Sequence, residues 1–174
     1  MNSLDVIFDT SPLITLCAFR VSGTLVIDLL LPYLNIYLVE TVAREGTANP
    51  THTDSAKIIS LLNNDLIKQL PIPDVNEAKM IDAYTKLGAG ERDSIRLGIQ
   101  KSTLPVIFDD YLALVIANRF GITTHLLLDL LVLLSSDYSL DKDIALNIIN
   151  AVALRYSAPF VEHTRYKLNH LRQT

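Results

Sequence analysis

The chain has 174 residues, of which 49% are hydrophobic and 20% charged, so it suits one globular domain and is too apolar to be disordered. Its net charge of −4 and its pI near 5.5 exclude a protein that coats nucleic acid through general positive charge, but not an enzyme whose site is itself acidic. A disulfide scaffold is excluded because Cys17 is the only cysteine.

Two apolar stretches, residues 25–34 and 125–134, were tested as membrane segments. Both are too short to cross a bilayer, and each contains an aspartate. The first residues carry no basic segment, so no signal peptide is expected. We therefore expect a cytoplasmic protein that makes no membrane contact.

Short apolar runs alternate along the chain with segments of helical spacing. The runs predict five strands, at residues 4–8, 35–39, 66–70, 104–108 and 122–126. Helices are predicted from Ser11 onward and at residues 40–45, 53–63, 74–86, 91–101 and 111–120. The glycines of residues 88–90 are expected to break the chain, and Asp74 to cap the helix before them. This alternation predicts an α/β fold with a parallel sheet that is covered on both faces.

The chain from Asp129 onward is predicted to be helical, with interruptions near Ser135 and Pro159. No linker divides the sequence, so residues 1–174 are expected to form a single domain with a core at about 4–130 and a helical extension at about 131–174. The last helices end in a locally basic stretch that includes Arg155 and Lys167. It could face RNA or a partner, but helices that cover the sheet are the simpler interpretation.

Acidic residues stand where strands end and where helices begin. Asp9 closes the first strand and Asp109 closes the strand at 104–108, while Glu45 and Glu91 lie on helices next to other strands. The carboxyl ends of parallel strands meet in one crevice, so these side chains are expected to converge. Clustered carboxylates repel one another, and a divalent cation such as Mg²⁺ or Mn²⁺ removes that cost. Such a site can activate water against a phosphodiester.

Four segments resemble the acidic motifs of PIN domains, in the same order. Residues 9–14 (DTSPLI) directly follow an apolar strand, and residues 42–45 (VARE) follow the second strand. Residues 90–95 (GERDSI) resemble the start of the third motif, and the pair Asp109-Asp110 resembles the last. The sequence is similar to the PIN-like branch related to VapC-type toxin ribonucleases.

The resemblance implies a three-layer α/β/α sandwich with a central parallel sheet and extra C-terminal helices. It also implies a metal-dependent endoribonuclease that uses Mg²⁺ or Mn²⁺ and acts on RNA. The implied catalytic residues are Asp9, Glu45, Glu91 and Asp109, and the implied metal ligands are these four with Asp93 and Asp110. A homodimer and a small antitoxin protein that occludes the crevice are the implied partners.

Each acid also has a structural interpretation that the sequence leaves open. Asp9 could cap the helix that follows it, and Asp110 could cap the helix from Tyr111. Glu91 and Asp93 point about 200° apart on a helix, so only one of them is expected to face the site. Glu45 could be a solvated charge at the end of its helix, with Glu40 as the competing candidate for the second acid.

Two departures from the family pattern concern the surface that faces the substrate. Residues 124–129 (THLLLD) replace a glycine-rich segment of the family, and Leu114 stands where the family often has arginine. They bear on the substrate and leave the acidic residues of the site intact.

Two other functions stay open: a non-catalytic PIN-like scaffold or regulator, and a receiver-type signalling domain. Of these the receiver is less favoured, because Lys68 and Lys101 are poorly placed for one.

Overall fold

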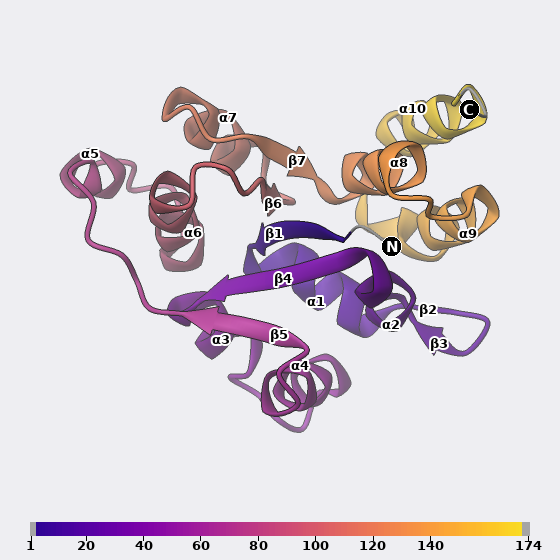
Figure 1. The fold of residues 1–174 in the computed structure, drawn as a ribbon, viewed down its shortest axis with the longest axis horizontal. Coiled ribbons are helices and arrows are strands. Elements are labelled where there is room, and N and C mark those ends of the chain that lie inside the picture. Colours follow the sequence, from indigo (N-terminus) through magenta and orange to yellow (C-terminus); the bar gives the residue numbers. More distant parts are fainter. Residues whose placement is uncertain (1–2, 172–174) are drawn as a thin grey trace.

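The computed structural model describes residues 3–171, and a five-stranded sheet forms its centre (Figure 1). All strands are parallel and lie in the order β5-β4-β1-β6-β7. Their bounds are β1 Leu4–Phe8, β4 Leu34–Val39, β5 Ile67–Leu70, β6 Val106–Phe108 and β7 Thr124–Leu126. The five predicted strands and their parallel pairing are thus confirmed. The strand order reverses between β1 and β6, and the carboxyl ends of these neighbours form the crevice where such sheets bind ligands.

Helices cover both faces of the sheet, which confirms the predicted three-layer sandwich (Figure 1). One layer consists of α1 (Thr10–Ala18), α3 (Glu40–Gly46) and α4 (Thr53–Asn63). The other contains α6 (Ala89–Gln100) and α7 (Tyr111–Arg119). Because both faces are covered, the strands β1 and β6 are wholly buried at residues 6–8 and 106–108 and read as continuous apolar runs.

Close packing of α6 on the sheet depends on Gly98. A Cβ atom there would lie 2.9 Å from Cγ2 of Val106 and 3.0 Å from Cγ2 of Ile122. The glycine therefore lets the helix approach β6, and this approach fixes the position of the N-terminus of α6 beside the crevice.

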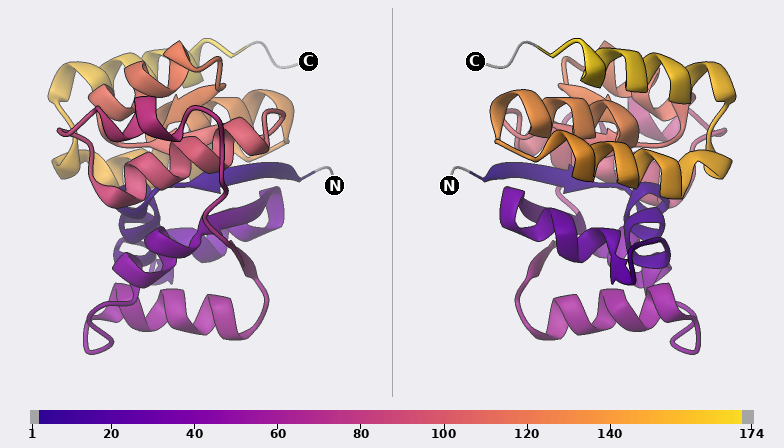
Figure 2. Two further views of the ribbon diagram at one scale, coloured as in Figure 1. Left: turned by 90° about the vertical axis from the view of Figure 1, so that its left-hand side faces the viewer. Right: turned by 90° about the vertical axis from the view of Figure 1, so that its right-hand side faces the viewer.

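The C-terminal helices pack together beside the sheet (Figure 2). They are α8 (Leu127–Asp137), α9 (Lys142–Val152), the short 3₁₀ helix η2 (Ala153–Arg155) and α10 (Ala158–Asn169). Many of their apolar side chains, among them Leu134 and Ile148, are fully buried, which favours a covering role for most of this extension. The predicted interruptions near Ser135 and Pro159 are confirmed: α8 ends at Asp137, and α10 begins at Ala158 with Pro159 in its first turn, where proline fits a helix.

The predicted helix at 74–86 is mostly wrong. Only α5 (Ala78–Asp82) is helical, and Asp74 caps no helix. In one continuous helix Ile81 and Leu87 would point about 120° apart. Both are buried, so the chain leaves the helix after Asp82 and turns each of them toward the core.

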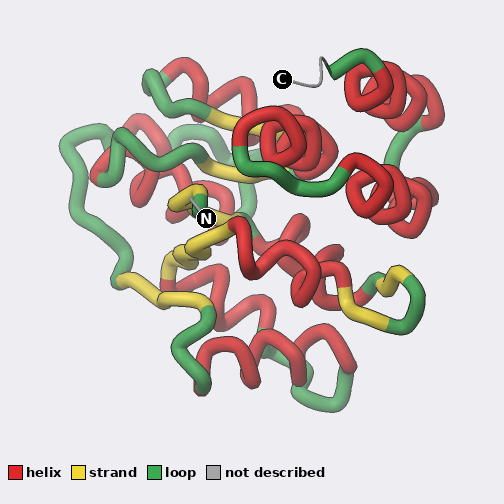
Figure 3. Tube along the Cα trace, turned by 45° about the vertical axis from the view of Figure 1, so that its right-hand side comes forward, coloured by secondary structure: helices red, strands yellow, loops and turns green. Residues whose placement is uncertain are grey.

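A small hairpin was missing from the predicted elements (Figure 3). It joins β2 (Arg20–Val21) to β3 (Thr24–Leu25) through Ser22 and Gly23, which both have positive φ. That geometry matches the turn of a two-residue hairpin. The hairpin leads into α2 (Val26–Leu30) and η1 (Leu31–Tyr33). Within residues 3–171, no helix has the length and apolar character that a membrane crossing needs.

Candidate active site

Asp9 follows β1 and occupies the N-cap position of α1, yet its carboxylate makes no capping hydrogen bond. One reason is local: Pro12 stands at the third helical position and has no N–H to donate. The side chain is only 4% exposed, and its Oδ1 atom has no hydrogen-bond partner among the described residues. Capping therefore does not explain this buried aspartate.

The surroundings of Asp9 favour its protonated form. Burial is the main cause that raises its pKa to about 7, and the backbone N–H of Thr10 offsets part of that rise. The charges of Glu91 and Glu45 raise the pKa further. A bound cation would reverse this effect, because it favours the ionised carboxylate.

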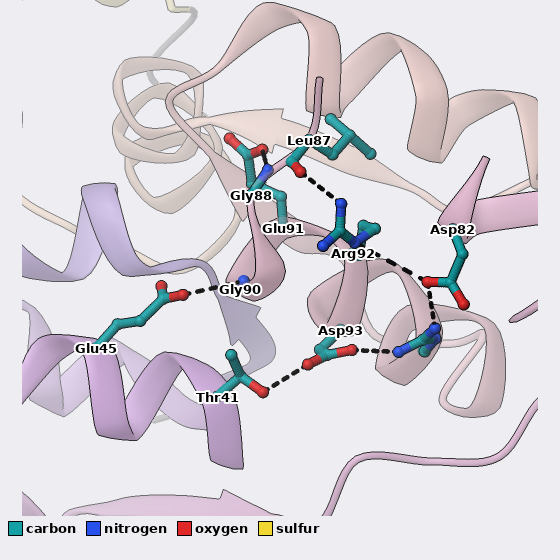
Figure 4. A network of polar contacts seen from close by, with 10 residues as sticks. Thr41, Glu45, Asp82, Leu87, Gly88, Gly90, Glu91, Arg92 and Asp93 are labelled. Atoms are coloured by element: carbon teal, nitrogen blue, oxygen red, sulfur yellow. Dashed lines mark hydrogen bonds and ion pairs between the residues drawn. The ribbon is translucent and has the colours of Figure 1, made fainter. Parts of the chain in front are cut away.

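Three elements hold Glu45 in place. Its Oε2 accepts a hydrogen bond from Oγ1 of Thr10 at 2.6 Å, and its Oε1 accepts one from the N–H of Gly90 at 3.2 Å. A Cβ atom on Gly90 would lie 2.5 Å from Oε2 of Glu45 and 3.0 Å from Oγ1 of Thr10. The absence of a side chain at Gly90 thus leaves room for this carboxylate (Figure 4).

Glu91 lies in the first turn of α6, which begins at Ala89 rather than at the predicted Glu91. Its Oε2 accepts a hydrogen bond from the N–H of Gly88 at 2.7 Å. Burial raises the pKa of Glu91; the Gly88 N–H offsets part of the rise, and the charges of Asp110 and Glu45 add to it. The predicted break at residues 88–90 is therefore the start of a helix that carries an acid of the site.

These three acids line one cavity of about 540 Å³ at the carboxyl ends of the strands. The hydroxyls of Thr10 and Ser11 and the cationic side chains of Lys86 and Arg155 line it as well. The structure therefore brings together Asp9, Glu45 and Glu91, which are far apart in sequence. Glu40, which competed with Glu45, does not line this cavity.

Asp109 follows β6 beside this cavity but turns toward the C-terminal helices. The hydroxyl of Tyr156 donates to its Oδ1 at 3.0 Å and to its Oδ2 at 3.1 Å. Burial raises the pKa of Asp109, and the Tyr156 hydroxyl and the charge of Arg155 offset part of that rise. Asp109 thus lies next to Ser11 and Arg155, which line the cavity, and is held by a neutral donor.

Asp110 takes the structural role that the sequence left open. Its Oδ1 accepts a hydrogen bond from the N–H of Ala113 at 3.0 Å and so caps α7. It does not line the cavity, but its charge reaches Glu91.

Asp93 points away from the cavity into a separate network (Figure 4). Its Oδ2 accepts a hydrogen bond from Oγ1 of Thr41 at 2.5 Å, and its Oδ1 pairs with Nη1 of Arg96 at 2.5 Å. Arg96 also pairs with Asp82 at 2.6 Å. The geometry favours Glu91 over Asp93 as the acid that α6 contributes to the cavity.

The carboxylates of the cavity suit a divalent cation by chemistry and by burial. They are hard oxygen donors, and the partnerless Oδ1 of Asp9 is a buried acceptor that the protein itself leaves unsatisfied. In their present orientations, no three acidic, histidine or cysteine side chains of residues 3–171 form a direct ligand cluster. Glu91 instead binds Gly88, and Asp109 binds Tyr156. Either acid would need a side-chain rotation to coordinate an ion directly, or would contact it through a water.

Arg155 and Tyr156 were not among the predicted site residues. They reach the site from η2 and the residue after it, across sequence separations of 144 residues for the contact to Ser11 and 47 for the contact to Asp109. Arg155 belongs to the locally basic stretch of the last helices, which was not predicted to reach the site. No local pattern marks either residue, because both contacts depend on how the C-terminal helices pack.

The doubly wound sheet carries its acidic crevice at the switch point between β1 and β6, where open α/β sheets bind their ligands. The family model for the PIN domain matches residues 5–169, so the chain belongs to the PIN-domain family. PIN domains are typically nucleases and generally use divalent metals. No curated protein sequence matches the chain. The family match favours the PIN interpretation over a receiver-type domain.

Proposed function

We propose that the protein is a metal-dependent endoribonuclease that hydrolyses RNA phosphodiester bonds in the acidic cavity. The observation that carries this proposal is the buried Oδ1 of Asp9: the residue lines the cavity, and this atom has no hydrogen-bond partner within residues 3–171. A carboxylate with a pKa near 7 in such a place is costly for a merely structural role. A cation that binds there would compensate the cost.

The residues that would hold Mg²⁺ or Mn²⁺ are Asp9, Glu45 and Glu91, with Asp109 beside them. When bound, the ion supplies a more acidic water and positive charge beside the phosphate. Asp110 remains a proposed contributor through its charge, whereas Asp93 is engaged elsewhere.

The protein's own groups keep this site in order. Thr10 and Gly90 fix both oxygens of Glu45, so its carboxylate stays at the cavity wall. Tyr156 holds Asp109 through both oxygens. Asp9 releases its proton when a cation binds, because the ionised form is then the favoured one.

We further propose a VapC-like toxin or a related effector that forms a homodimer and binds a small antitoxin protein. An apolar groove supports a protein partner: Tyr84, Leu112 and Ile116 line a cavity of about 240 Å³ next to the active site. Lys86 lines both cavities, so a partner in this groove would lie near the acids. Light scattering of the purified protein, alone and co-expressed with a candidate antitoxin, tests both partners.

The test of the nuclease is cleavage of labelled single-stranded RNA with Mg²⁺ or Mn²⁺. We expect the wild type to cleave and Asp9→Asn to lose about 1,000-fold or more in rate, as when a catalytic carboxylate is removed. Asp74→Asn is the matched control, because Asp74 is exposed and remote from the cavity lining. EDTA should abolish cleavage by both the wild type and the control.

A DNA oligonucleotide of the same sequence tests the choice of substrate. Faster cleavage of DNA than of RNA would contradict the endoribonuclease. Absence of cleavage of either, by protein that binds Mn²⁺ in a thermal-shift assay, would favour the non-catalytic PIN-like alternative.

A further inference from the structure

The acidic cavity is lined by two cationic side chains that have few contacts within the protein. Lys86 lies in the loop before α6, and Arg155 lies at the end of η2; both are exposed and line the cavity. Neither forms an ion pair with any residue between 3 and 171.

Neutral donors already serve three of the four acids at the site. Glu45 binds Thr10 and Gly90, Glu91 binds the N–H of Gly88, and Asp109 binds Tyr156. The guanidinium of Arg155 makes a single contact, from Nη2 to Oγ of Ser11 at 3.3 Å. Most of its donors therefore remain available for an anion from outside.

The backbone of Arg155 is held in position, although its guanidinium makes only one hydrogen bond with residues 3–171. The next residue, Tyr156, is anchored to Asp109 and packs edge-to-face against Phe160, with ring centroids 6.0 Å apart. The preceding Leu154 is 98% exposed, so η2 projects into solvent and the core does not require an arginine there. The anchored tyrosine thus holds the guanidinium at the cavity.

We propose that Arg155, together with Lys86, binds the phosphodiester backbone of the nucleic-acid substrate at the acidic cavity. This inference rests on the proposed function for the identity of the substrate. A guanidinium matches a phosphate through paired N–H donors, while the ammonium of Lys86 adds a second charge from another element. The contact is to phosphate and not to bases, so it adds affinity without sequence preference.

The test is fluorescence anisotropy of a short labelled single-stranded RNA with the full chain in EDTA, over a series of KCl concentrations. Arg155→Gln should weaken binding about 5- to 10-fold at low salt. It should also reduce the slope of log K against log salt by about 0.7, the value for one phosphate contact on a single strand. Lys86→Gln should act in the same direction.

Arg20→Gln is the matched control, because Arg20 is exposed on the β2–β3 hairpin and contacts only the carbonyl of Gly23. It should leave both affinity and slope unchanged. A DNA oligonucleotide of equal length should show the same loss with Arg155→Gln, since the backbone phosphate is common to both.

The outcomes separate the inference from the proposed function. If the wild type cleaves RNA while Arg155→Gln binds and cleaves like Arg20→Gln, the inference is overturned and the nuclease stands. If the wild type cleaves nothing but Arg155→Gln still loses affinity and slope, the phosphate site is supported and the nuclease fails. A wild type that binds no oligonucleotide overturns the inference.

Discussion

Two groups of carboxylates flank the first turns of α6, and the protein compensates their charges in opposite ways (Figure 4). On one side, Asp93 and Asp82 share Arg96, and Asp82 also lies 3.9 Å from Arg92. On the other side, Glu45 and Glu91 receive only neutral donors, and Oδ1 of Asp9 receives none. Carboxylates on the two sides of one helix thus differ in whether arginine compensates their charge.

The difference separates structure from function. Where a carboxylate pairs with arginines, its charge is satisfied when the chain folds, and the network ties α6 to α3 and α5. Where carboxylates gather and none forms an ion pair within residues 3–171, folding is penalised unless something else binds. The raised pKa values of Asp9 and Glu91 are the measure of that penalty.

The largest expected effect on stability is that of Asp9→Asn. Unfolded Asp9 loses its proton near its ordinary pKa of 3.8, whereas the folded protein retains it until about pH 7. Without metal, stability therefore falls as pH rises between these values and levels off above them. Asn carries no charge, so at pH 8 the variant should be more stable than the wild type by about 3–4 kcal/mol. Urea unfolding across this pH range measures the difference.

The control for this prediction is again Asp74→Asn, which should follow the wild-type pH profile. Added Mg²⁺ or Mn²⁺ should stabilise the wild type but not Asp9→Asn, by about 2.7 kcal/mol at 100 times the dissociation constant. An Asp9→Asn variant that is less stable than the wild type at pH 8 without metal would show that this carboxylate is compensated after all.

Asp93→Asn should act in the opposite direction. It removes the charged partner of Arg96 from a position where the Asp93 side chain is only 9% exposed. We expect a loss of about 2–3 kcal/mol in unfolding free energy, because a buried charge-assisted contact is weakened. Cleavage per folded molecule should stay the same. Unchanged stability with lost cleavage would instead place Asp93, and not Glu91, in the active site.

Gly90→Ala tests the space that the protein reserves for Glu45. The new Cβ would meet Oε2 of Glu45 at 2.5 Å, so the end of that side chain must shift. Alanine is a better helix former than glycine, and stability should change by less than about 1 kcal/mol. We expect cleavage to fall about 10-fold, as for a misplaced catalytic group.

Gly88→Ala is the matched control, since a Cβ there would lie 3.6 Å from Oε2 of Glu91, an ordinary contact, and the N–H that binds Glu91 is kept. Equal losses of cleavage in both variants would mean that the helix start, and not the position of Glu45, limits activity.

The sheet and the position of Asp9 could be predicted because their signals are local, whereas Glu45 and Glu91 were selected through the family resemblance. A strand that is buried on both faces reads as an apolar run, and the acid that ends it stands at the carboxyl edge of the sheet. Asp9 is the clearest example, directly after Phe8. Asp109 shows the limit of this rule, because it ends β6 but turns to Tyr156. The helical spacing also showed that only one of Glu91 and Asp93 would face the site, but not which one, because that depends on where Thr41 and Arg96 lie.

The missing parts depend on packing between distant segments. The helix predicted before Leu87 failed because the core takes up both Ile81 and Leu87, which local spacing cannot show. The contact of Tyr156 with Asp109 is set by the path of α9 and η2. The sequence around either residue has no pattern that predicts this contact. The positions of the acids that line the cavity could therefore be predicted from the sequence, while the residues that hold and flank these acids could not.

Tyr156→Phe should have the smallest effect of these substitutions. It removes a neutral donor from one acid of the site and so tests what such a donor contributes. The hydroxyl donates to both oxygens of Asp109, so its loss should cost about 1 kcal/mol of stability at neutral pH. Without it the pKa of Asp109, already raised by burial, rises further. The folded variant then keeps its proton to higher pH than the folded wild type. The stability difference between them should therefore grow as pH increases.

Tyr166→Phe supplies the control for this step, since Tyr166 lies on α10, is 61% exposed and stacks on His170, away from the acids. Its stability should match the wild type at every pH. If Tyr156→Phe behaves in the same way, the tyrosine hydroxyl adds nothing to Asp109. A growing difference for Tyr156 alone would show that the C-terminal helices, which the acidic motifs do not include, supply part of the environment of the site.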